Sequence, residues 1–165
     1  MAAMALMLGL LGISISVLDW PAWASHTTFA QGDVFVAVGH GQVQWRHPDG
    51  SLNKMLATGT GGRETTTRGM AFDAAGNLYV TNFDMRSVSK FDTRGNLLGT
   101  FGSGYDRGPE SIVFDRTGNA YVGQADGTKT ILKFDARGNL LKALNVPTEN
   151  RGSDWIELAA DQHTM

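Results

Sequence analysis

The sequence predicts an all-β fold made of short antiparallel strands that are joined by tight turns. Glycine supplies 21 of the 165 residues, nearly twice its usual share of about 7%, and it does so without the strict period of collagen. The pattern D-x-x-G-N occurs four times, and long segments of the chain repeat one another. Segments of about five residues rich in Val, Phe, Tyr and Leu lie between these turns, and this length and composition are typical of strands.

Each D-x-x-G-N pattern predicts a hairpin turn. A short hairpin loop built on a type I turn needs one residue with positive φ, which glycine adopts without Cβ strain. The aspartate can accept hydrogen bonds from the backbone N–H groups just ahead of it, which nucleates the turn. These aspartates lack the clustered spacing of a calcium loop, so we assign them to turn formation. The predicted turn residues are Asp73, Gly76, Asp92, Gly95, Asp115, Gly118, Asp135 and Gly138.

The repeats indicate the architecture. The segment FDAAGNLYVTN at 72–82 returns as FDRTGNAYVGQ at 114–124, an offset of 42, and KFDTRGNLLGTF at 90–101 returns as KFDARGNLLKAL at 133–144, an offset of 43. Four short strands in about 43 residues are typical of a β-propeller blade, a twisted four-stranded antiparallel meander packed by its neighbours on both faces. An antiparallel sandwich is the alternative architecture.

A weaker copy of the repeat spans 32–56, and we expect Trp45 to take the place of Phe91 and Phe134 in the core between blades, and Gly50 that of Gly95. Closed propellers have about four to eight blades, so the roughly three blades of this chain would form an incomplete ring with exposed apolar end faces. A longer chain or a second copy would supply the rest. The predicted partial propeller at 32–165 divides into blades at about 32–68, 69–109 and 110–153 and the start of a next blade at 154–165.

The N-terminal residues 1–24 are predicted to be an export signal, with a linker at 25–31. No charged side chain precedes Asp19, and an apolar run of about 17 residues is short for a bilayer span. Pro21 and the small-residue pattern of residues 22–24 follow, as a signal peptidase site requires. We therefore expect a secreted or periplasmic protein, attached to a membrane only if this segment is an uncleaved anchor.

Charge and composition exclude several classes of function. The net charge of −2 argues against nucleic acid, because phosphate binding needs a basic face. Cysteine is absent, which excludes disulfides, thiolate zinc sites and cysteine nucleophiles. The four histidines, at 26, 40, 47 and 163, lack a paired metal-binding spacing, so the sequence predicts no histidine metal site.

The blade sequences resemble NHL repeats and the six-bladed gluconolactonase/regucalcin-like and streptogramin-lyase-like propellers. The resemblance is carried by GMAFDAAGNLYVTN and VSKFDTRGNLLGTFG within 69–102, and by ESIVFDRTGNAYVGQ and ILKFDARGNLL within 110–141. TENRGSDWIELAADQHTM at 148–165 is similar to an exported bacterial subgroup. The lactonase branch implies a divalent cation, Ca²⁺ or Zn²⁺, held on the channel axis by one Glu, two Asn and one Asp. Glu110 and Asn82 are the candidate metal ligands here, although the Glu-Gly-Pro and Ser-Asn-Gly-Leu motifs of that branch are absent.

The repeat positions also predict a ligand-binding face. In a propeller the loops before each innermost strand and the loops between the second and third strands share one face, where a few polar groups in an apolar pocket would fix a small ligand. Glu110 is the strongest candidate, because Pro109 fixes the backbone just before it. The ligand-face candidates are Glu110, Arg68, Asp154, Asn82, Asp84, Gln124, Asp126, His40 and Trp155.

Two functions fit this sequence. The first is an exported, non-enzymatic propeller that binds a small molecule, a glycan or a protein partner. The second is a metal-dependent hydrolase or lactonase, in which a channel-bound divalent cation polarises an ester carbonyl or activates water. The fold alone chooses neither, because propellers host unrelated activities.

Overall fold

The structure is a computed structural model that describes residues 26–62, 64–146, 151–162 and 164–165. These residues form eleven strands in three antiparallel sheets and no helix. No helix that could span a membrane occurs in these ranges. The predicted export signal at 1–24 lies outside the described residues.

Each sheet is a meander in which strands that follow one another in the chain are paired. The first sheet contains β1 (Val34–Val38), β2 (Gln42–Arg46) and β3 (Leu52–Ala57). The second contains β4 (Thr67–Phe72), β5 (Leu78–Asn82), β6 (Ser87–Phe91) and β7 (Leu97–Thr100). The third contains β8 (Arg107–Phe114), β9 (Ala120–Asp126), β10 (Ile131–Phe134) and β11 (Leu140–Leu144).

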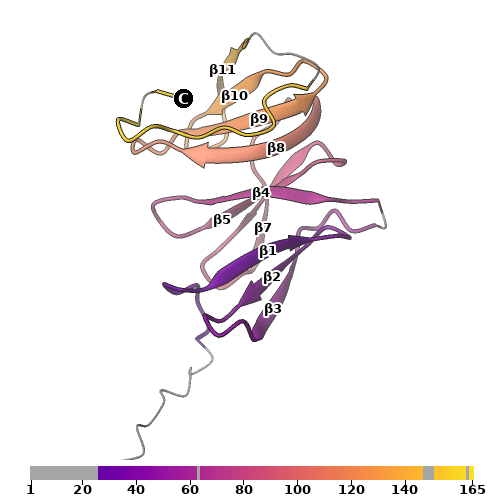
Figure 1. Ribbon diagram of the computed structural model, residues 1–165, viewed down its shortest axis with the longest axis vertical. Helices are drawn as coiled ribbons and strands as arrows, with labels where there is room; N and C mark the ends of the chain where they lie inside the picture. Colours follow the sequence, from indigo (N-terminus) through magenta and orange to yellow (C-terminus); the bar gives the residue numbers. More distant parts are fainter. Residues whose placement is uncertain (1–25, 63, 147–150, 163) are drawn as a thin grey trace, which may run out of the picture.

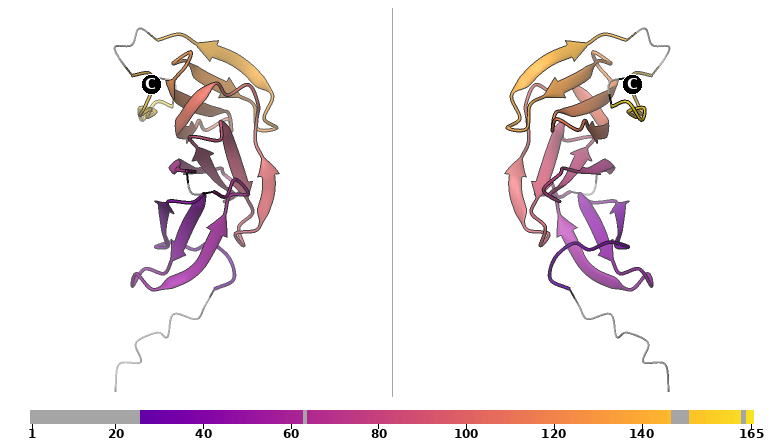
Figure 2. Two further views of the ribbon diagram at one scale, coloured as in Figure 1. Left: turned by 90° about the vertical axis from the view of Figure 1, so that its right-hand side faces the viewer. Right: turned by 90° about the vertical axis from the view of Figure 1, so that its left-hand side faces the viewer.

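The three sheets are stacked in chain order along the long axis of the molecule (Figure 1), and side views show them fanned along a curve (Figure 2). The opening strands β4 and β8 of successive sheets lie against each other. Their approach depends on Gly69, because a Cβ atom there would lie 2.5 Å from the carbonyl oxygen of Glu110. Successive meanders fanned about their first strands are blades of a β-propeller, whose ring the described residues do not close.

Two apolar clusters hold the stack together. Alternate side chains of β5 point to opposite faces, so Leu78 and Val80 join the cluster shared with the first sheet, whereas Tyr79 joins the cluster shared with the third. This arrangement explains why the middle strands are apolar on both sides. The first cluster contains Val43, Trp45, Leu56, Leu78, Val80 and Phe91, and the second contains Tyr79, Val88, Phe101, Ile112, Ala120, Val122, Leu132 and Phe134.

The predicted equivalence of Trp45 with Phe91 and Phe134 is wrong by one residue. Trp45 pairs with Phe35 on one side and Lys54 on the other, just before the bulge in β2. In the second sheet Lys90 holds this register, and Phe91 follows the bulge. Trp45 is still part of the core between blades, but it faces the second sheet from the first, whereas Phe91 faces the first sheet from the second.

The four D-x-x-G-N turns have the geometry that the pattern predicts. Their glycines have φ between 69° and 86°, and each glycine N–H donates to the aspartate carbonyl oxygen at 2.9–3.0 Å. In each turn one carboxylate oxygen accepts from the N–H groups two and four residues ahead, and the other accepts from the asparagine side chain. In the first sheet Gly50 makes the same backbone bond to His47, which stands where the other turns have aspartate.

Residues 26–33, which include most of the predicted linker, pack along the first sheet. The Phe29 ring contacts the rings of Phe35 and Trp45, with centroids 4.8 Å from each. The Phe29 N–H also donates to the carbonyl oxygen of Thr93 in the second sheet. This segment therefore ties the first two blades together at their outer edge.

Candidate functional site

Four of the predicted ligand-face residues meet in one pocket of about 330 Å³. Arg68 comes from β4 and Glu110 from β8, and Asp154 and Trp155 come from the C-terminal segment. That segment is held beside β9, because the Ser153 N–H donates to the carbonyl oxygen of Gln124 at 3.0 Å. We call this the Glu110 pocket. Its lining residues are Thr67, Arg68, Gly69, Glu110, Asp154 and Trp155.

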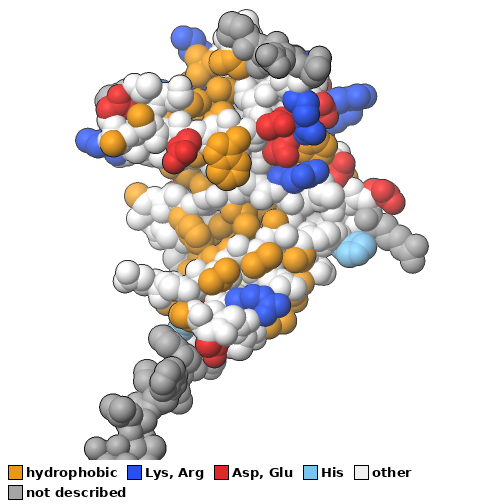
Figure 3. All heavy atoms as spheres, viewed as in Figure 1, with side chains coloured by type: hydrophobic (Ala, Val, Ile, Leu, Met, Phe, Trp, Pro, Cys, Tyr) orange, Lys and Arg blue, Asp and Glu red, His pale blue; other side chains and the backbone are white. Residues whose placement is uncertain are grey.

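Charged side chains of both signs alternate around this pocket, and Figure 3 shows acidic and basic groups gathered over β8 and the C-terminal segment. One oxygen of Glu110 lies 3.6 Å from a guanidinium nitrogen of Arg68, and the other lies 3.1 Å from Arg151. The Arg151 Nε also lies 2.9 Å from Oδ2 of Asp154. Arg151 was not predicted from the sequence, although it stands three residues before Asp154 as Arg107 stands three residues before Glu110, so the repeat itself could have found it.

One acceptor of the Glu110 pocket is left unused. Oδ1 of Asp154 is buried and has no hydrogen-bond partner among the described residues. A buried acceptor without a donor costs free energy, so such a group usually receives a bond from water or a ligand. Trp155 lies beside it with 80% of its surface exposed. The pocket therefore offers donors, acceptors and one apolar ring.

Asn82 and Gln124, which were predicted to face a ligand, are instead buried and form hydrogen bonds with neighbouring residues of their own sheets. The Asn82 amide donates to Ser89 Oγ at 2.9 Å and to Ser87 Oγ at 3.2 Å. The Gln124 amide accepts from the Asp106 N–H at 2.7 Å and donates to Thr130 Oγ1. Neither side chain lines one of the pockets found in the described part of the chain.

Glu110 and Asn82, the two candidate metal ligands, lie in different surroundings. Both oxygens of Glu110 face guanidinium groups, and the Asn82 amide is held by two serines. A divalent cation at Glu110 would have to compete with two arginines for the same carboxylate. The arrangement therefore suits recognition of polar groups better than coordination of a metal ion.

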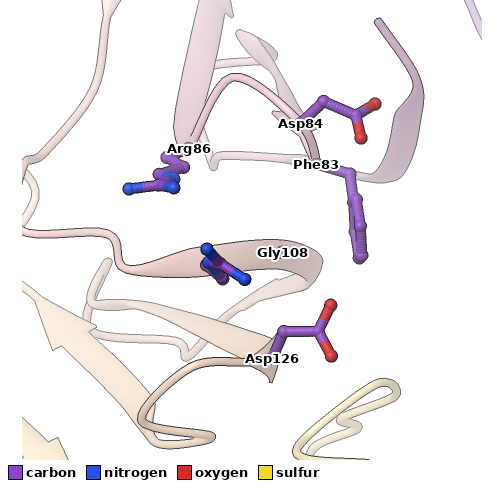
Figure 4. A pocket seen from close by; sticks show the side chains of 6 residues that line it. Phe83, Asp84, Arg86, Gly108 and Asp126 are labelled. Carbon is purple, nitrogen blue, oxygen red and sulfur yellow. The ribbon is translucent and has the colours of Figure 1, made fainter. Parts of the chain in front are cut away.

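Two further candidates, Asp84 and Asp126, line a second pocket of about 220 Å³, where their side chains lie on one side of the hollow with Phe83 between them (Figure 4). Asp84 is fixed by Thr66, whose N–H and hydroxyl donate to it at 2.9 and 2.7 Å. The Arg68 guanidinium stacks 5.0 Å from the Phe83 ring centre, which links the two pockets. The lining residues are Phe83, Asp84, Arg86, Arg107, Gly108 and Asp126.

The last candidate, His40, lies apart from both pockets. It stands in the turn between β1 and β2 with φ of 66° and is exposed. Its counterparts by repeat are Asp84, in the turn after β5, and Asp126, at the end of β9, and both line the second pocket. The turn between β1 and β2 is one residue shorter than the turns after β5 and β9.

Comparisons with known proteins agree with this fold. A family model described as strictosidine synthase-like, N-terminal, matches residues 99–133. A probable peptidyl-alpha-hydroxyglycine alpha-amidating lyase of Caenorhabditis elegans is 29% identical over 98 residues, which cover 53% of this chain and 28% of the relative. The chain thus spans little more than a quarter of the length of that curated relative.

Comparison with solved structures also supports a β-propeller fold. Virginiamycin B lyase from Staphylococcus aureus matches with a TM-score of 0.61 at 14% identity, over 75% of this chain and 41% of the lyase. The WD40 β-propeller domain of Doa1 matches with a TM-score of 0.58 at 15% identity, over 73% of this chain and 39% of that domain. The protein is a β-propeller protein. An enzyme and a WD40 domain resemble it about equally, so the fold does not choose an activity.

Proposed function

We propose that this chain is part of a β-propeller binding module that holds a small glycan at the Glu110 pocket. The observation that carries the proposal is the convergence of Arg68, Glu110 and Asp154, from three successive repeats, with the exposed Trp155. A few convergent polar groups beside an apolar surface are typical of small-ligand sites. Since the predicted export signal would direct the protein out of the cytoplasm, we also propose a secreted or periplasmic location.

The chemistry of the pocket favours a sugar ring. Sugar hydroxyls both donate and accept hydrogen bonds, and the pocket presents carboxylate acceptors and guanidinium donors side by side. The C–H face of a pyranose is apolar and flat enough to cover an indole, which Trp155 supplies. A hydroxyl that donates to Oδ1 of Asp154 would satisfy the buried acceptor that the protein leaves unpaired.

Titration with mono- and disaccharides, followed by calorimetry and by saturation-transfer NMR, tests the proposal. At least one sugar should bind the full chain saturably. Glu110→Gln should weaken that sugar's affinity at least about tenfold, as loss of a hydrogen bond to a charged group implies, and Trp155→Ala should also weaken it at least about tenfold, because the stacked ring is lost. Asp126→Asn is the matched control, because it alters a carboxylate of the other pocket. The proposal is wrong if no sugar binds, or if the control variant weakens binding as much as Glu110→Gln.

A second candidate function is catalysis by a complete propeller ring. It is favoured by the sequence relative, which is named as a lyase, and by the lyase among the structural neighbours. The metal-dependent hydrolase or lactonase that the family resemblance implies needs a divalent cation at Glu110, whose oxygens face two arginines. Lactone hydrolysis that stops with a chelator and with Glu110→Gln, but not with Asp126→Asn, would favour this alternative.

A further inference from the structure

Three side chains outside both pockets form a group with metal-binding chemistry. His26 and Asp33 precede β1, with Asp33 immediately before its first residue, and His47 follows β2. Their ligand atoms all lie within 4.8 Å of one another. The Nε2 atom of His26 lies 2.8 and 3.0 Å from the two oxygens of Asp33. The rings of His26 and His47 meet edge to face with centroids 5.0 Å apart. The hairpin of β1 and β2 thus brings together residues that are far apart in the sequence.

His47 has an unpaired buried nitrogen. The residue is 8% exposed, and its Nδ1 has no hydrogen-bond partner within the part of the chain that the structure describes. His47 occupies the turn position that holds aspartate in the other turns, but Asp49 accepts the turn hydrogen bond from the Ser51 N–H at 2.8 Å. His47 is therefore not needed as the side chain that nucleates this turn. A buried imidazole without a partner calls for a ligand, since an unsatisfied polar group destabilises the fold.

Asp33 is oriented as a metal-ligating carboxylate would be. Its side chain is buried, and its Oδ2 accepts from the indole N–H of Trp45 at 2.7 Å and from the Ala30 N–H at 2.9 Å. These two donors fix the carboxylate and leave Oδ1 directed toward His26. Hydrogen bonds of this kind orient the ligands of metal sites.

We propose that His26, Asp33 and His47 bind one divalent transition-metal ion, with Zn²⁺ the best fit. Two imidazoles and one carboxylate are a ligand set that Zn²⁺ accepts, with water in a fourth position. Bonds of about 2.0–2.1 Å place tetrahedral ligands roughly 3.3 Å apart, so side-chain rotation has to close the widest gap, within 4.8 Å, by about 1.5 Å. The ion would fasten the segment before β1 to the turn after β2.

Zinc titration of the chelator-treated full chain tests this site, with calorimetry for stoichiometry and the visible spectrum of Co²⁺ for geometry. One equivalent should bind the wild type, and Co²⁺ should give the intense absorption of a four-coordinate site. His47→Asn and Asp33→Asn should each weaken Zn²⁺ binding by at least about 10–100-fold, the range seen even for second-shell changes. Zn²⁺ should also raise the thermal unfolding midpoint of the wild type but not of these variants.

Two control variants keep the result interpretable. His40→Asn removes an exposed histidine of the same sheet and should leave Zn²⁺ affinity unchanged, as should Glu110→Gln in the other site. Circular dichroism shows whether His47→Asn folds, and if it does not, His26→Asn replaces it, because His26 lies outside the sheets. The proposal is overturned if the folded wild type binds no Zn²⁺, or if His40→Asn weakens binding as much as the cluster variants.

Discussion

Tyr79 and Tyr121 hold the same position in the second and third sheets, yet their surroundings differ. Each hydroxyl donates to the turn aspartate six residues before it, and each ring carries a lysine ammonium about 5 Å away. Tyr79 is 1% exposed and packs against Phe101, which follows β7 in its own sheet, and against Phe114 of the third sheet. Tyr121 instead lines an open hollow of about 450 Å³. The same local sequence therefore forms a buried core only where a further blade packs against it.

The first sheet shows the same contrast on its outer face. Phe35 points toward the second sheet and packs against the core, whereas its neighbours Val34 and Val36 point the other way and are 45% and 38% exposed. A propeller blade is stabilised by its two neighbours. The difference between covered and open faces therefore predicts which faces of the isolated chain associate with other molecules and which side chains contribute most to its stability.

The largest expected effect of the open faces is on assembly. The chain from residue 25 onward should dimerise or aggregate, because apolar side chains on both end faces remain exposed to water. Val36→Lys on the first sheet and Leu144→Lys in the hollow beside Tyr121 should lower the apparent mass measured by light scattering. A well-dispersed wild-type monomer would show that these faces do not need a partner.

Alanine substitution of the two tyrosines compares the stability contributed at a covered position with that contributed at an open one. Tyr79→Ala should destabilise the protein by about 3–5 kcal/mol, because it leaves a cavity between two sheets. Tyr121→Ala should cost about 1 kcal/mol, as is usual for a less enclosed site. Denaturant unfolding gives both values. Equal losses would mean that Tyr121 is covered in solution.

Valine substitutions at the turn glycines distinguish the cost of backbone strain from the cost of a clash with neighbouring atoms. Gly50 has φ of 84° with open space around its missing Cβ, whereas a Cβ at Gly138 would lie 2.8 Å from the Gly102 nitrogen. Gly50→Val should therefore cost about 1–2 kcal/mol for a β-branched residue at positive φ, and Gly138→Val more, about 2–3 kcal/mol. Gly95→Val should fall between them, since its Cβ would meet a movable leucine side chain. Unchanged unfolding midpoints would contradict this assignment of the turns.

The smallest expected effect is the pH dependence of the turns. Burial alone would raise the pKa of Asp115, but hydrogen bonds from Asn119 and Thr117 outweigh it and lower that pKa well below 3.8. A lowered pKa in the folded state means that the turn stabilises the protein above pH 3.8 and loses this contribution as the pH falls further. Asp115→Asn should flatten this acid-side loss in urea unfolding measured at successive pH values, whereas Asp49→Asn should change it less, because Asp49 is exposed.

Local signals in the sequence predicted the turns, and the repeats predicted which turns belong together. Glu110 and Arg68 could be paired in advance because they stand at one repeat position, and β4 and β8 lie side by side. Asn82 and Gln124 also share one repeat position, but the repeat does not reveal that Ser89 and Thr130 hold their amides inside the sheets. The cluster of His26 with His47 depends on a hairpin and on a packed N-terminal segment, which no spacing in the sequence reveals.

The missing side chain of Gly69 has a consequence for how the second and third blades are spaced. β4 and β8 approach each other there through main-chain atoms, so any larger residue would force the two strands apart. The angle between these two blades therefore depends on the absence of a Cβ atom at Gly69.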